Sequence, residues 1–594
     1  MTTTRTDAPG RVIPILEKEF EDFRTEATAF LEGQRDEAQF IGFRLKQGVY
    51  GQRQPERQMI RVKLPFGAVT ADQMDAFAQV AADYAPLRKG HVTTRQNYQF
   101  HHIPLAKMPE VLELLGDVGL SSREACGNTV RNVTGDPYAG VRPDEPFDTS
   151  PYAGAFVRYF VRQDLTQLLP RKFKVAFTGS EQDEAITDIH DLGFIPEIRE
   201  VDGTPTRGFR MVAGGGLAIM AKHAVVLREW VSVDDYLRVS EAVLRIFNAA
   251  DELRKNRAKA RIKFLVHRVG EAEFRRMVDE ELQKPWAQQR IPPDGLLFLD
   301  DEEADAPRIP VNREQPGADR AEFERFVSAN VRKQRQSGYC TVDVKIPQGD
   351  LLPEQFRGIA ETMRTYGNGR ARTSVNQNIV LRWIPEGSLY PVWRALGELG
   401  LNEAGAGEIT DVVSCPGTDS CKLGITCSMG LNRAVTEKLY EMRIDDPTTR
   451  KMRVNMSGCP NSCGQHHIAS IGFHGAAIKA ANDGGRQVPA YHVFLGGTRG
   501  NGRIRIGQLL KARVPSKRVP IVVERFVRYY EAERQTPEEE FDAFVDRVGA
   551  APFESLLQDL VIPPDFSLDN MEEFIDWERD GLYVLERGEG ECAI

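Results

Sequence analysis

The chain contains an internal duplication, and this feature limits its fold more than any other. Six segments within the first 216 residues resemble six later segments, in the same order and always 279 to 282 positions apart. RVKLPFGAV at 61–69 pairs with DVKIPQGDL at 343–351, and RKFKVAFTG at 171–179 pairs with RKMRVNMSG at 450–458. One match could arise by chance, but six at one spacing predict two similar halves related by a pseudo-two-fold axis. We expect the functional site where the halves meet.

Each half begins with alternating strand and helix patterns. The strand-like 61–65 precedes an amphipathic segment in which Thr70 and Gln73 have the spacing of a capping box. The second half places Pro353 in the first turn of the equivalent helix. The alternation over residues 92–103 predicts a strand. The predicted fold class is therefore α+β, internally duplicated.

Length, charge and cysteine content set the broad class of protein. A chain of 594 residues exceeds one core and needs several domains. The net charge of −9 argues against nucleic acid as the main partner. Eight cysteines are too few for a disulfide scaffold in a chain of this length. The sequence also contains no apolar run of about 18 residues, the length that a membrane-spanning helix needs. We predict a soluble, cytoplasmic protein.

Four of the cysteines form two close pairs that predict a metal site. Cys415 and Cys421 are separated by five residues, Cys459 and Cys463 by three, and 37 residues lie between the pairs. Zinc ribbons usually space both pairs by two residues. The wider loops, each with proline beside a cysteine, favour an iron–sulfur cluster. A structural zinc in a non-catalytic protein remains the alternative.

The residues around the cysteines carry a family resemblance. CPGTDSCKLGIT at 415–426 and CPNSCG at 459–464 resemble the signature of sulfite and nitrite reductases, in which sirohaem is coupled to a [4Fe–4S] cluster. RVKLP, RQNYQFHHI, TVRNV and LPRKFK extend the resemblance over about residues 45–500. It implies ferredoxin-like half-domains combined with sirohaem- and cluster-binding domains. The cluster ligands would be Cys415, Cys421, Cys459 and Cys463, and Cys463 would also bridge to the sirohaem iron.

The duplication and the resemblance together divide the chain into seven segments. We expect an N-terminal helical extension (1–45), a ferredoxin-like half-domain (46–122), an anion- and sirohaem-binding domain (123–283), a linker (284–335), a second ferredoxin-like half-domain (336–402), an iron–sulfur and sirohaem-binding domain (403–515) and a C-terminal helical region with a tail (516–594).

Basic residues of the first half match the anion pocket of the family. Reducing sulfite or nitrite takes six electrons, and cations must hold the oxyanion and supply protons. A lone Arg or Lys on a strand is usually a solvated surface residue, but Asp343 stands at the repeat of Arg61, so only one half keeps the pocket. The resemblance implies Arg61, Arg131, Lys172 and Lys174 as catalytic residues and Arg95, Gln99, Gly215 and Asn461 as cofactor contacts.

These residues imply an assimilatory sulfite reductase. The string RKFK resembles the sulfite branch, whereas the nitrite branch tends to carry asparagine at the position of Lys174; nitrite reduction to ammonia is the alternative. No Gly-x-Gly-x-x-Gly fingerprint opens a strand–turn–helix unit, so electrons should come from a ferredoxin or a separate flavoprotein. A covalent link between Cys126 and a tyrosine such as Tyr50 is a further hypothesis for the pocket.

Overall fold

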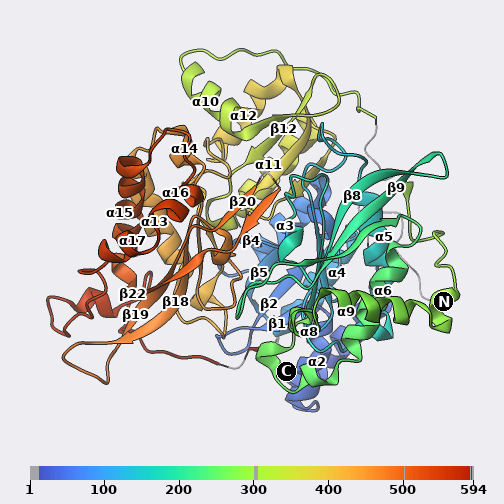
Figure 1. Cartoon of the computed structure of the whole chain (residues 1–594), viewed down its shortest axis with the longest axis horizontal. Helices are drawn as coiled ribbons and strands as arrows, with labels where there is room; N and C mark the ends of the chain where they lie inside the picture. The colour runs from blue at the N-terminus through green and yellow to red at the C-terminus, as the bar shows by residue number, and fades with distance from the viewer. Residues whose placement is uncertain (1–12, 300–304, 501, 589, 592–594) are drawn as a thin grey trace.

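The computed structural model describes residues 13–299, 305–500, 502–588, 590 and 591. Figure 1 shows the first half, in blue and green, beside the second half, in yellow to red. None of the helices in the described ranges combines the length and apolar character needed to cross a membrane.

A five-stranded sheet opens the first half. Its strand order is β1-β2-β5-β4-β13, and all its pairs are antiparallel. The strands are β1 (Val49–Gly51), β2 (Arg57–Val62), β4 (Gly90–Val92), β5 (Tyr98–Pro104) and β13 (Asp350–Leu351). The helices of this region are α1 (Glu17–Leu31), α2 (Glu37–Lys46), α3 (Ala71–Asp83) and α4 (Met108–Asp117).

The second half repeats this sheet in the order β11-β12-β15-β14-β3. The strands are β11 (Val331–Lys333), β12 (Tyr339–Val344), β14 (Arg370–Thr373), β15 (Ile379–Pro385) and β3 (Ala68–Thr70), with helices α10 (Arg320–Asn330), α11 (Pro353–Tyr366) and α12 (Leu389–Glu398). The edge strands β13 and β3 each come from the other half. The two halves therefore complete each other's sheets, and one apolar core runs through both.

Two larger sheets also match each other. Their orders are β10-β9-β8-β7-β6 and β16-β17-β18-β19-β22, each with parallel pairs at one end and antiparallel pairs at the other. The first contains β6 (Val130–Gly135), β7 (Phe173–Phe177), β8 (Leu192–Val201), β9 (Thr204–Ala213) and β10 (Val225–Ser232). The second contains β16 (Val413–Ser414), β17 (Val454–Ser457), β18 (Ile471–Lys479), β19 (Gln487–Leu495) and β22 (Gln508–Pro515).

Helices pack against each of these sheets and enclose separate cores. On the first sheet they are α5 (Ser150–Phe160), α6 (Tyr236–Asn248), α7 (Asp251–Arg254), α8 (Ile262–Val269) and α9 (Glu271–Leu282). On the second they are α13 (Ser428–Met442), α14 (Pro447–Arg450), α15 (Val519–Glu533), α16 (Phe541–Val548) and α17 (Ala551–Ser555), and a small hairpin joins β20 (Thr498–Gly500) to β21 (Arg503–Arg505).

The backbone repeats even where it is unusual. Phe66 and Gln348, equivalent in the duplication, both adopt positive φ, at 45° and 59°. Gln96 and Gln377 do the same, at 60° and 67°. Non-glycine residues rarely occupy this region, so its recurrence at equivalent positions supports the duplication.

Two local predictions are confirmed, and one is wrong in part. Thr70 Oγ1 accepts from the Gln73 amide at 3.3 Å while Gln73 Oε1 accepts from the Thr70 amide at 3.0 Å, which completes the capping box. Pro353 is the first residue of α11. The single strand expected over 92–103 is interrupted: Val92 ends β4 and β5 begins only at Tyr98, because residues 93–97 form the turn between them, with Gln96 in the left-handed region.

Candidate functional site

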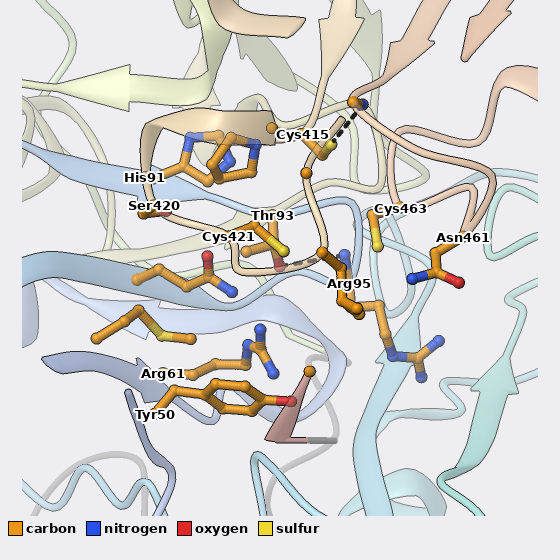
Figure 2. A pocket seen from close by; sticks show the side chains of 18 of the residues that line it. Tyr50, Arg61, His91, Thr93, Arg95, Cys415, Ser420, Cys421, Asn461 and Cys463 are labelled. Atoms are coloured by element: carbon orange, nitrogen blue, oxygen red, sulfur yellow. Dashed lines mark hydrogen bonds between the residues drawn. The ribbon is translucent and has the colours of Figure 1, made fainter. Parts of the chain in front are cut away.

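A large cavity lies between the two halves. The space not filled by protein atoms is about 1440 Å³, part of it open to solvent. In Figure 2, Tyr50 and Arg61 approach it from strands of the first half, and the labelled cysteines come from loops of the second half. The predicted site residues that line it are Arg61, Arg95, Gln99, Arg131, Lys172, Lys174, Cys415, Cys421, Cys459, Asn461 and Cys463.

Parallel strand pairing brings the two cysteine loops together. Cys415 directly follows β16, and Cys459 comes shortly after β17, its parallel neighbour, so both lie at the same edge of the sheet. The loops pack backbone to backbone. A Cβ at Gly458 would meet the Gly417 Cα at 2.6 Å, and Gly417 itself has a φ of +55°. The Gly458 amide donates to Cys415 Sγ at 3.3 Å.

The four thiols form a set that suits a cluster. Burial raises the pKa of Cys459, and the neighbouring Cys463, Cys415 and Cys421 raise it further, because four thiolates repel one another without a positive centre between them. Four cysteine thiolates are the ligand set of a [4Fe–4S] cluster.

Arg61 and Arg131 converge on the opposite side of the cavity. Nη1 of each donates to the Ala125 carbonyl at 3.1 Å. Arg131 Nε also donates to the Gly127 carbonyl at 2.9 Å. Gln99, which pairs with Arg61 across β2 and β5, accepts from its Nη2 and Nε at 2.7 Å when the amide is oriented to satisfy both groups. The loop at 125–127 thus holds two guanidinium groups of like charge side by side.

Lys172 and Lys174 stand at the start of β7 and both line the cavity. Their spacing of two places them on one side of an extended chain, as predicted. Burial lowers the pKa of Lys174 well below its usual value, and the positive charges of Arg95, Arg261 and Lys172 lower it further, whereas Cys463 opposes this shift. The basic group of one half and the cysteine set of the other therefore interact within one cavity.

Arg95 is held more firmly by protein than we expected. Its Nη2 donates to the Asn132 carbonyl at 2.5 Å, its Nη1 lies 2.9 Å from His190 Nε2, and its buried Nε has no partner among the described residues. Burial and the nearby Arg261 lower the pKa of Arg95 to about 9. The guanidinium is therefore held mainly by groups of the protein itself.

Gly215 is the one predicted cofactor contact that does not line the cavity. A Cβ there would lie 2.2 Å from the Asp188 carbonyl oxygen, so close backbone packing requires glycine. Its role toward sirohaem stays a prediction. Three further residues line the cavity although they were not predicted from the sequence as site residues: His91, His101 and Lys422. Of the three, only Lys422 had a signal in the sequence, namely its position directly after Cys421.

Tyr50 and Cys126 belong to one small apolar group beside Arg61. Tyr50 packs against a cluster that contains the buried Cys126, and Arg61 Nη1 lies 3.5 Å from Cys126 Sγ. The covalent link between them stays a prediction. Peptide mass mapping that finds Cys126 unmodified would disprove it.

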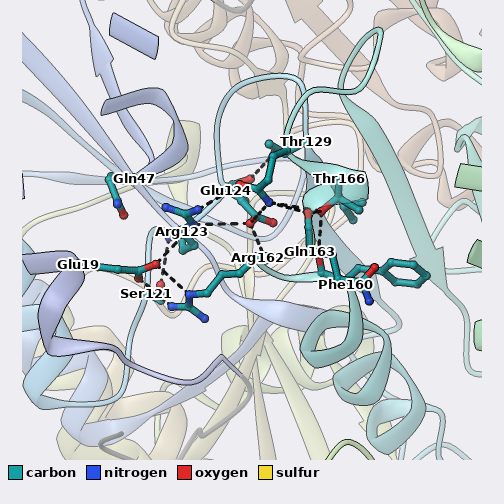
Figure 3. Close-up of polar contacts among 12 residues, drawn as sticks. Glu19, Gln47, Ser121, Arg123, Glu124, Thr129, Phe160, Arg162, Gln163 and Thr166 are labelled. Carbon is teal, nitrogen blue, oxygen red and sulfur yellow. Dashed lines mark hydrogen bonds and ion pairs between the residues drawn. The ribbon is translucent and has the colours of Figure 1, made fainter. Parts of the chain in front are cut away.

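A buried polar network anchors the loop that carries Ala125 (Figure 3). The Glu124 side chain is fully buried, and its Oε1 accepts from the Arg162 amide and from Gln167 Nε2, each at 2.8 Å. Arg162 in turn pairs with Glu19 of α1 at 2.8 Å. The first helix therefore supports, through this network, the loop that positions Arg61 and Arg131.

Glu124→Ala is expected to destabilise the protein by about 3 kcal/mol, because it leaves the Arg162 amide and nearby Arg123 without their buried acceptor. The midpoint of thermal unfolding should fall by several degrees. Glu113→Ala is the control, since Glu113 pairs with Arg24 on the surface and such pairs contribute about 0–1 kcal/mol. Equal midpoints for the two variants would contradict this role of Glu124.

Comparison with known proteins agrees with this geometry. The model of the nitrite and sulphite reductase 4Fe-4S domain matches residues 126–286 and 405–561. The model of the nitrite/sulfite reductase ferredoxin-like half domain matches residues 50–118 and 332–399. Because each model matches once in each half, the duplication and the predicted fold class are confirmed.

Individual relatives cover most of the chain. A chloroplastic ferredoxin–nitrite reductase of Betula pendula is 32% identical over 82% of this chain and 79% of its own length. A ferredoxin sulfite reductase of Mycobacterium tuberculosis is 29% identical over 81% of this chain and 80% of its own length. The structure of the Mycobacterium tuberculosis NirA protein matches with a TM-score of 0.73 and 25% identity, over 90% of this chain and 97% of that one.

These matches decide between the two kinds of metal site that the cysteine spacing left open. The cysteine loops lie inside the matched 4Fe-4S domain, and the family binds sirohaem together with this cluster. The alternative, in which the four cysteines bind a structural zinc ion in a non-catalytic protein, is therefore wrong. The chain belongs to the nitrite and sulphite reductase family.

Proposed function

We propose that the protein is an assimilatory sulfite reductase that takes electrons from an external donor. The observation that carries this proposal is the shared cavity, in which Lys174 of the first half interacts with Cys463 of the second. An oxyanion held by the basic group would lie beside the cofactor that the cysteines hold. Six electrons convert sulfite to sulfide, and the released oxygens leave as water.

The cofactors fit the residues present. Cys415, Cys421, Cys459 and Cys463 would hold the [4Fe–4S] cluster, with Cys463 as the thiolate shared with sirohaem. Bound together, these groups would supply the electrons one at a time and an iron centre for the anion. The protein side chains bind the anion, orient it and deliver protons.

The four basic residues divide these tasks by their chemistry. Arg61 and Arg131, fixed on the Ala125 carbonyl, present rigid guanidinium groups suited to an oxyanion. Lys172 and Lys174 supply protons. Because burial and like charges lower the pKa of Lys174, its ammonium releases a proton more readily than an ordinary lysine does.

We propose a ferredoxin as the donor. The relatives named above are ferredoxin-dependent by their names, and the chain contains no dinucleotide fingerprint of its own. A separate flavoprotein remains the other candidate. We place the protein in the cytoplasm, because the seven cysteines in the described part are all free thiols, in agreement with a reducing compartment.

Nitrite is the second candidate substrate. Six ferredoxin–nitrite reductases match at 30–32% identity and two sulfite reductases at 29%, a difference too small to separate the two activities. The lysine at position 174, in place of the asparagine that the nitrite branch tends to carry, favours sulfite.

Lys174→Asn tests the substrate. We expect it to lower kcat/KM for sulfite by at least about tenfold while lowering kcat/KM for nitrite less, because the larger, more basic anion loses a proton donor. Steady-state rates on both anions, with chemically reduced ferredoxin, give the ratio. A wild-type protein that prefers nitrite tenfold or more would reverse the assignment.

A further inference from the structure

The segment formed by residues 575–588, 590 and 591, here called the C-terminal strap, packs along the loop that carries two of the cysteines. Asp576 Oδ2 accepts from the Cys427 amide at 2.6 Å. The Tyr583 hydroxyl donates to the Ile425 carbonyl at 2.9 Å. Further along, the Gly588 amide donates to the Lys422 carbonyl at 3.0 Å. The strap thus follows residues 415–427, here called the cluster loop, almost from end to end.

The strap then crosses to the first half, where it meets Arg53, Arg44 and β1. Figure 1 shows the red C-terminal trace running from the second half toward the first. Arg53 Nη2 donates both to the Glu586 carbonyl, at 2.8 Å, and to the Gly424 carbonyl of the cluster loop, at 2.9 Å. One guanidinium therefore joins the strap, the cluster loop and the first half.

Glu591 makes the strongest of these connections. Its carboxylate pairs with both terminal nitrogens of Arg44 at 2.7 Å, accepts from the Gly51 amide at 2.8 Å and lies 3.0 Å from Lys422 Nζ. The Glu591 side chain is only 2% exposed, and that of Arg44 only 7%. A buried carboxylate with this many donors is fixed in place, and losing it would leave Arg44 buried without a counter-charge.

Glu591 contacts two residues, Gly51 and Lys422, that belong to two different walls of the cavity. Tyr50 and Gly51 line it from β1, whereas Lys422, Leu423 and Gly424 line it from the cluster loop. Gly590, next to Glu591, also lines it, and a Cβ there would lie 2.5 Å from Leu423 Cδ1. Glu591 therefore lies where the two walls meet.

We propose that Glu591 is a positioning residue of this reductase, which locks the cluster loop to β1 and so keeps the cofactor cavity closed along this wall. The proposal rests on the proposed function only in that the cavity holds the cofactors; which anion is reduced does not affect it.

Hydrogen exchange on the cofactor-free protein tests the lock itself. We expect Glu591→Ala to speed amide exchange by about fivefold or more both in residues 418–424 and in residues 49–52, because losing one or two kcal/mol of local stability changes an opening equilibrium by factors of about 5–30. Glu591→Gln keeps the size of the side chain, so it should also speed amide exchange in both segments, but by a smaller factor. Glu586→Gln is the matched control, since that side chain is 75% exposed and its ion pair with Arg53, at 3.6 Å, is a surface pair of the kind that contributes about 0–1 kcal/mol.

Cyanide binding to the loaded enzyme tests the consequence for the cavity. The association rate of cyanide with sirohaem, followed by absorbance, should rise about fivefold in Glu591→Ala and stay at the wild-type value in Glu586→Gln. Unchanged exchange in 418–424, exchange that changes only within the strap, equal effects in the control, or an unchanged cyanide rate would each overturn the proposal. None of these outcomes depends on whether the enzyme reduces sulfite or nitrite, so failure here is distinct from failure of the proposed function.

Discussion

Cys463→Ser is expected to abolish reductase activity and to remove most of the bound iron and acid-labile sulfide. Cys463 is the thiol that interacts both with the cysteine set and with Lys174, and it is the proposed link between cluster and sirohaem. The loss of activity should exceed the roughly 10- to 100-fold loss that follows mutation of a residue that only supports a metal ligand. Iron and sulfide analysis with an absorption spectrum on the same sample gives the readout.

Cys427→Ser is the matched control for this variant. Cys427 lies in the cluster loop with Cys415 and Cys421, but it is buried, its amide donates to Asp576 and its thiol lies 3.2 Å from Asp419 Oδ1. Serine can keep the latter contact, so iron content and activity should remain close to wild type. A Cys463→Ser protein that keeps full iron content and activity would contradict the assignment of the cluster ligands.

Lys174→Met should lower kcat/KM for the anion by about 10²–10³-fold, the range observed when one preorganised donor of charge is removed from an active site. The reason is that Lys174 is a buried cation within the cavity, beside the basic residues expected to hold the oxyanion. Iron content and the absorption spectrum should not change, since Lys174 belongs to the half that does not contain the four cluster cysteines.

Lys511→Met is the control for Lys174→Met, because Lys511 is an exposed residue of β22. It removes the same charge without touching the cavity and should leave kcat/KM unchanged. If Lys174→Met lost its cofactors along with its activity, the residue would have a structural role and the anion-binding assignment would be wrong.

Divergence of the two halves explains why each keeps only part of the site. Arg61 faces the cavity, but its repeat, Asp343, is buried and accepts from the Tyr138 hydroxyl at 2.9 and 2.8 Å. The repeat of Arg95 is Asn376, whose Oδ1 accepts from Arg499 and Arg453. At both positions the second half uses the equivalent residue for packing between elements, and the first half uses it for the cavity.

The sequence was sufficient for features that depend on local pattern or on the repeat. The duplication predicted equivalent sheets, the capping box at Thr70 formed as expected, and eleven of the twelve predicted site residues line one cavity. Short motifs succeed here because cysteine loops and cation pairs act over a few residues, and the fold brings the motifs together through paired parallel strands.

Features that depend on distant contacts were not predictable in this way. The exchange of β3 and β13 between the sheets involves strands of three and two residues, too short to show any periodicity. Residues 93–97 belong to the stretch that was expected to be a strand, yet the left-handed Gln96 makes them a turn. The ion pair of Glu591 with Arg44 spans 547 positions, and nothing in a polar, glycine-rich tail indicates a buried carboxylate.

The most direct test of the whole account is an absorption spectrum of the purified protein, produced with sirohaem supply ensured, with iron and acid-labile sulfide counted on the same sample. A sirohaem coupled to a [4Fe–4S] cluster should give haem-type bands with about five irons and four sulfides per chain. A colourless protein that holds a single zinc per chain would contradict it.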